Sequence, residues 1–66
     1  MNQINARAAY WDRAANAYHK RANTLMDKFV KTGEIRWQRQ ANTNRDRGVE
    51  AAALADRLWR TARSST

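Results

Sequence analysis

The side chains that could carry out chemistry in this sequence are few and lie far apart. His19 is the single histidine, cysteine is absent, and the six Asp and Glu residues show no paired placement for acid–base work. No Asp or Glu stands three or four residues from His19, so one helix face does not offer the ligand spacing of a metal site. Gly33 and Gly48 belong to no phosphate-loop pattern. We therefore expect no enzyme, no metal and no cofactor, with His19 at the surface.

Basic side chains are the chemistry that the sequence does supply. Thirteen Lys and Arg against six Asp and Glu give a net charge of +7 and a pI of about 11.2. Most are arginines, whose planar guanidinium suits phosphates, carboxylates and aromatic faces. A balance this basic indicates an acidic partner, of which nucleic acid is the commonest. The alternative interpretation is that these charges only solvate the surface.

A four–three spacing of apolar residues runs through the first half of the chain and indicates the element that positions these charges. The seam consists of Ile4, Ala8, Trp11, Ala15, Tyr18, Ala22, Leu25 and Phe29. An unbroken repeat of this kind predicts an amphipathic helix over residues 3–31. Gly33 follows as a C-terminal cap, with Lys31 as the cation in the last turn. Residues 32–34 therefore predict a tight turn, with Glu34 in the first turn of the next helix.

The second half keeps the same spacing with smaller residues. Its seam is Trp37, Ala41, Asn44, Gly48, Ala51, Ala55, Leu58 and Ala62. When the two seams are folded back on each other about Gly33, a large side chain meets Ala or Gly in five of eight levels, as Tyr18 meets Gly48. Close helix packing needs this alternation of size. The sequence therefore predicts an all-α fold, an antiparallel two-helix hairpin with a second helix over 35–63, forming a single domain over 1–66.

Two residues weaken the prediction of a continuous second helix. Gly48 costs about 1 kcal/mol relative to Ala inside a helix, and Asn44 places a polar group on the seam. The stretch 40–48 also lacks any large apolar side chain. A break there, giving three helices, is the structural alternative.

One flank of the hairpin is poor in charge and rich in apolar side chains. A single seam does not offset an ordering cost of roughly 1.5 kcal/mol per residue, so we expect additional apolar burial. The simplest source is a second copy of the chain, giving a homodimeric four-helix bundle. The expected interface residues are Met26, Val30, Ile35, Val49, Ala52 and Trp59, with Trp59 as a possible anchor. The alternative is a scatter of exposed apolar residues without a role.

The opposite flank and the outer surface collect most of the basic residues. The candidate nucleic-acid-binding residues are Arg7, Arg13, Lys20, Arg21, Lys28, Arg36, Arg39, Arg47, Arg57 and Arg60. Arg21 and Arg47 are expected at the same level of the hairpin, where their charges repel unless an anion lies between them. Such a stripe predicts a ridge that binds phosphates.

No DNA-reading motif accompanies this stripe: helix–turn–helix spacing, a zinc finger and a basic region with a leucine zipper are all missing. In architecture the chain resembles the ROP-type plasmid regulators, short helical hairpins that dimerise into a four-helix bundle. The resemblance rests on length, the alanine-rich seam and the hairpin symmetry. It implies the dimeric bundle and transfers no functional residue to this sequence.

These patterns lead to one functional expectation with two alternatives. The chain is expected to be a small dimeric nucleic-acid-binding or regulatory accessory protein that acts through its arginine-rich face. The first alternative is an adaptor or inhibitor of phage or plasmid type that docks on an acidic protein partner. The second, a helix pair lying on anionic membrane, is disfavoured because helix pairing explains the seam. No apolar run reaches the roughly 20 residues of a membrane span, and no signal-peptide core is evident, so a cytoplasmic location is expected.

Overall fold

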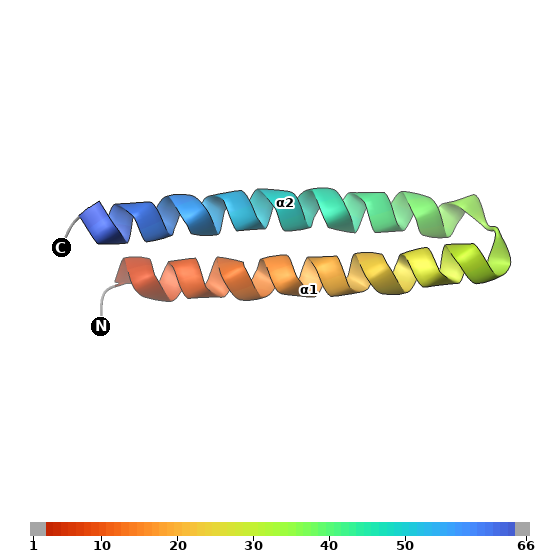
Figure 1. Cartoon of the computed structure of the whole chain (residues 1–66), viewed down its shortest axis with the longest axis horizontal. Helices are drawn as coiled ribbons and strands as arrows, with labels where there is room; N and C mark the ends of the chain where they lie inside the picture. The colour runs from red at the N-terminus through yellow and green to blue at the C-terminus, as the bar shows by residue number, and fades with distance from the viewer. Residues whose placement is uncertain (1–2, 65–66) are drawn as a thin grey trace.

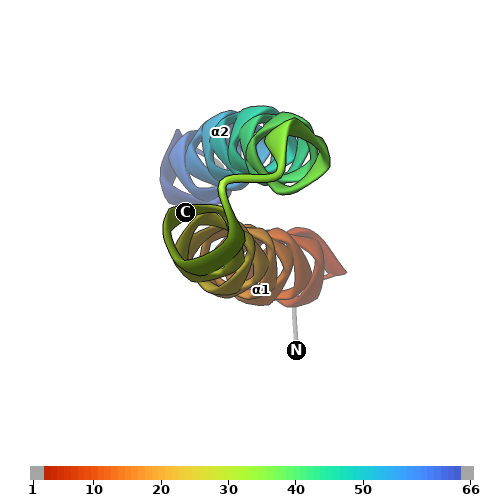
Figure 2. The same cartoon turned by 90° about the vertical axis from the view of Figure 1, so that its right-hand side faces the viewer.

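The computed structural model describes residues 3–64 and shows two long helices folded back on each other (Figure 1). Helix α1 spans Gln3–Thr32 and helix α2 spans Ile35–Ser64. The Cα trace is a rod of 50 × 15 × 11 Å, and in the end-on view the two helices cross at a shallow angle (Figure 2). The predicted all-helical hairpin is confirmed. The expected domain limits at residues 1 and 66 lie outside the described residues.

The turn between the helices contains only two residues, Gly33 and Glu34. Gly33 has a φ of 72°, and its N–H donates to the carbonyl of Phe29 at 2.7 Å, as a glycine C-cap does. The N–H of Glu34 donates to Oγ1 of Thr32 at 3.2 Å, which closes the turn. Glu34 was expected inside the first turn of the second helix; it instead precedes that helix, which begins at Ile35.

The core of the hairpin is made of small side chains. The buried residues are Ala8, Ala15, Ala22, Ala41, Gly48, Ala51, Ala55 and Ala62, all of them seam positions. The larger seam residues, such as Trp11 and Leu25, are only half-buried, and no large side chain within residues 3–64 is fully buried. Alanine at the line of closest approach lets the two backbones pack tightly, while the bulky side chains spread over the edges of the contact.

Helix α2 continues through the stretch where a break was considered, so the three-helix alternative is wrong. The polar seam residue Asn44 has a hydrogen-bond partner inside α2, because its amide nitrogen donates to the carbonyl of Gln40 at 2.9 Å. Gly48 was expected to make room for Tyr18. The structure places the His19 imidazole there instead, because a Cβ at position 48 would lie 2.9 Å from its Cε1.

Candidate functional site: the basic flank

The ten candidate basic residues are all exposed, and most of their charges have no internal partner. Arg36 Nε lies 2.7 Å from a carboxylate oxygen of Glu34, and Arg60 Nε lies 3.0 Å from one of Asp56. Within residues 3–64 the other eight form no ion pair with Asp or Glu. Their charges are therefore available to an anion from outside the chain.

Aromatic rings of the seam hold several of these cations close to the helix surfaces. Lys28 Nζ lies 4.8 Å and Arg36 Cζ 4.5 Å from the centre of the Trp37 ring. Arg21 Cζ lies 5.8 Å from the centre of the Tyr18 ring. All three contacts are within the range of cation–π attraction, about 6 Å. The contacts place these basic groups close to the seam, so the seam helps to shape the charged surface.

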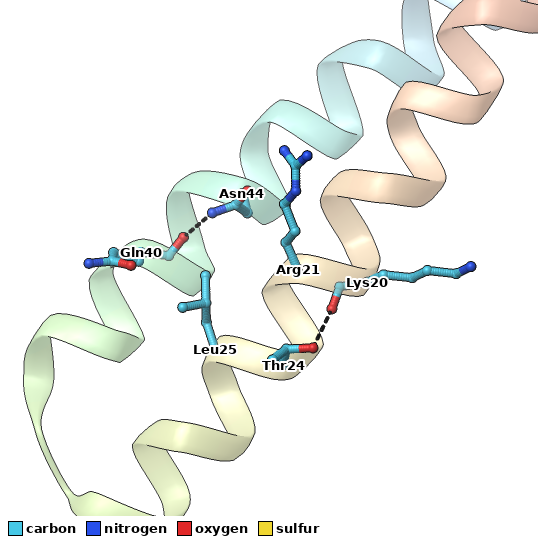
Figure 3. Close-up of a pocket in the computed structure, with 6 residues that line it drawn as sticks. All are labelled: Lys20, Arg21, Thr24, Leu25, Gln40 and Asn44. Atoms are coloured by element: carbon cyan, nitrogen blue, oxygen red, sulfur yellow. Dashed lines mark hydrogen bonds between the residues drawn. The ribbon is translucent and has the colours of Figure 1, made fainter.

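Two open grooves follow the same flank between the helices. The first has a volume of about 460 Å³ and is lined by Lys20, Arg21, Thr24, Leu25, Gln40 and Asn44 (Figure 3). The second has a volume of about 300 Å³ and is lined by Trp11, Tyr18, Arg47, Glu50, Ala51 and Leu54. Arg21 stacks on Tyr18, and Arg47 shares a groove with that same tyrosine. Of the expected pair of arginines, Arg21 thus lies over the Tyr18 ring, and Arg47 lines the smaller groove together with that ring.

The other flank carries the candidate interface residues. Val30, Ile35 and Val49 are 76%, 54% and 59% exposed, and Ala52 is also exposed. Met26 and Trp59 are half-buried. Large apolar side chains on this flank are therefore exposed to solvent.

Sequence reasoning missed several contacts that the structure brings together. Thr24, Gln40 and Asn44 were assigned to no binding site, yet they line the larger groove. Folding the chain about Gly33 places Leu25 opposite Ala41, whose helix neighbours include Gln40 and Asn44, so the groove could have been found from the register. The hydrogen bond between Trp59 and Asp12 was also missed.

The described residues bring together no metal-binding cluster. Within residues 3–64, no three His, Cys, Asp or Glu side chains form a group that could hold a metal ion. Neither α1 nor α2 is long and apolar enough to cross a membrane. The chemistry that this surface offers is attraction of anions by guanidinium and ammonium groups, combined with hydrogen bonding by side-chain amides.

The fold and this surface define a basic, antiparallel helical hairpin with grooves along its charged flank. No protein family, no curated protein and no solved structure matches the chain. The resemblance to ROP-type regulators therefore rests on the hairpin architecture alone.

Proposed function

We propose that this hairpin is a binding protein that attaches to nucleic acid through its basic flank. The observation that carries the proposal is the set of eight exposed basic side chains that have no carboxylate partner within residues 3–64. Phosphate groups neutralise such charges and release condensed counterions, which makes the interaction favourable and dependent on salt. Arginine also binds phosphate in a bidentate manner.

The test is fluorescence anisotropy with labelled duplex DNA, single-stranded DNA and stem-loop RNA, at low salt and at about 0.15 M salt. Binding at micromolar concentration or tighter that persists at the higher salt is expected. The double variant Arg21→Glu with Arg47→Glu should abolish binding and leave the helical circular dichroism unchanged. Absence of binding to all three probes at physiological salt would overturn the proposal.

A matched pair of substitutions separates the basic flank from net charge alone. Arg47 and Arg45 are both exposed arginines of α2, two residues apart and therefore on opposite flanks. Arg47→Glu is expected to weaken binding at least about ten-fold, and Arg45→Glu to weaken it much less, because only the first faces the ligand. Equal losses would show that the charge acts without a defined site.

An acidic protein partner is the competing function, and the same variants test it. If nucleic acid fails to bind, a pull-down from nuclease-treated lysate should recover a protein with wild type and not with the double variant. If the interaction survives nuclease digestion, the arginines bind carboxylates of a protein instead of phosphates of a nucleic acid.

We further propose that the chain acts as a homodimer, in which the charge-poor flanks of two hairpins pack into a four-helix bundle. The hairpin exposes 5078 Å², whereas a compact monomer of 7.7 kDa should expose about 4,300 Å². The large apolar residues Val30, Ile35 and Val49 lie off the seam and are exposed in the single hairpin. A second copy would cover them, and the flank carries both Asp12 and Arg45, so it does not repel itself.

Sedimentation velocity tests the dimer. The wild-type chain is expected to sediment at twice 7.7 kDa at micromolar concentration, with a melting temperature that rises with concentration. Val49→Glu should dissociate it, whereas Thr43→Glu, an exposed change elsewhere on α2, should not. A fully helical wild-type monomer with a concentration-independent melting temperature would contradict the dimer.

A further inference from the structure

The larger groove on the basic flank combines an apolar floor with basic and amide side chains. Leu25 and Arg21 project from α1 toward α2, and Asn44 approaches from α2, whereas Lys20 extends outward (Figure 3). Leu25 is half-buried at the floor. The volume of about 460 Å³ falls in the range of small-molecule sites, roughly 300–1,000 Å³.

Charge distinguishes this groove from its neighbour. The smaller groove contains Glu50 among its lining residues, whereas the larger one is lined by Lys20 and Arg21 and by no acidic residue. Within residues 3–64 neither Lys20 nor Arg21 forms an ion pair. The larger groove therefore favours a ligand with a negative group at one edge.

Asn44 of α2 supplies the opposite edge. The amide nitrogen of Asn44 is held by the carbonyl of Gln40 at 2.9 Å, which orients the side chain and leaves its carbonyl oxygen free to accept a further hydrogen bond. The Gln40 side chain extends away from the groove (Figure 3), so the ligand would meet the amide of Asn44. A side-chain amide can hydrogen-bond to the edge of a nucleobase, whereas it carries no charge for a phosphate.

From this combination we propose that the larger groove binds one unpaired nucleotide of a single strand. The phosphate lies at Arg21, the base lies over Leu25, and the base edge contacts the amide of Asn44. This inference rests on the proposed nucleic-acid binding and narrows it to a substrate class.

A duplex fits this groove less well than a single strand does. In a duplex the bases are stacked and their edges are paired, so only the phosphates reach a shallow surface between two helices. In a single strand the base can swing outward and cover an apolar floor. The groove should therefore add affinity for single strands beyond the charge attraction that both forms share.

The test compares a short labelled single strand with the duplex of the same sequence at about 0.15 M salt. The wild-type chain is expected to prefer the single strand. Asn44→Leu removes the amide at nearly constant size and leaves the charge unchanged, so single-strand affinity should fall about five-fold, the loss of one hydrogen bond. Duplex affinity should not change. Asn42→Leu, the same replacement at an exposed position outside the groove, should alter neither.

A second readout follows the amide directly. The side-chain amide signal of Asn44 in a nitrogen-15 NMR spectrum should shift when the single strand is added, and shift much less with the duplex. Equal affinity for both forms, or no effect of Asn44→Leu, would overturn the nucleotide site while leaving the phosphate-binding flank intact. Failure of both probes to bind would overturn the two proposals together, and binding only to an acidic polypeptide would assign the groove to a protein.

Discussion

The indole nitrogen of Trp59 donates a hydrogen bond to a carboxylate oxygen of Asp12 at 2.7 Å, and so joins the two helices at the end of the hairpin remote from the turn. The chain connects the helices only at Gly33 and Glu34, so the opposite end depends on side-chain contacts for its closure. Forty-seven residues separate the two partners in the sequence.

Removal of this bond should loosen the free end. Trp59→Phe keeps an aromatic ring and removes the donor, so the free energy of unfolding should fall by about 1 kcal/mol in urea titrations. Asp12→Ala removes the acceptor, and the double variant should lose little more than either single one. Additive losses would show that the two residues stabilise the hairpin independently.

Gly48 and His19 provide a second test of helix packing. Gly48→Ala should gain about 1 kcal/mol from helix propensity, yet the new Cβ would lie 2.9 Å from the His19 ring, which must move. We expect little net change in the wild-type background and a gain of about 1 kcal/mol when His19 is also alanine. Thermal unfolding of the four chains measures this difference. The same gain in both backgrounds would mean that the ring moves without cost.

Replacement of the turn glycine, in contrast, should lower the stability of the hairpin. Gly33 adopts a φ of 72°, and a Cβ there would meet no atom within 4 Å, so only the backbone conformation opposes a side chain. Gly33→Ala should lower the free energy of unfolding by about 1 kcal/mol, and Gly33→Asn by less, because Asn tolerates this conformation better. An alanine variant as stable as wild type would contradict the left-handed cap.

The contact between the Lys28 ammonium and the Trp37 ring should affect both the free energy of unfolding and the fluorescence of the indole. Lys28→Gln removes the group that lies 4.8 Å from the ring centre and should cost about 0.5 kcal/mol, the value for an exposed cation–π contact. The indole emission should change as well. Lys31→Gln, another lysine of the same helix end with no ring contact, should leave the indole emission unchanged.

The sequence by itself determined the two helices, the turn and the seam. The four–three repeat from Ile4 to Phe29 and the glycine at position 33 are local signals, since helix periodicity and capping act over a few residues. The seam register also predicted which small residues are buried, because antiparallel folding about one glycine leaves a single way to align two equal repeats.

Only the tertiary structure decided which side chains meet across the hairpin. His19, and not Tyr18, occupies the space above Gly48, and the larger groove combines Leu25 with Asn44. These contacts depend on the crossing of the helices and on side-chain rotamers, which shift a residue by a few ångströms without changing its place in the repeat. A periodic pattern identifies the face on which a residue lies, whereas its neighbour on the other helix is set by three-dimensional packing.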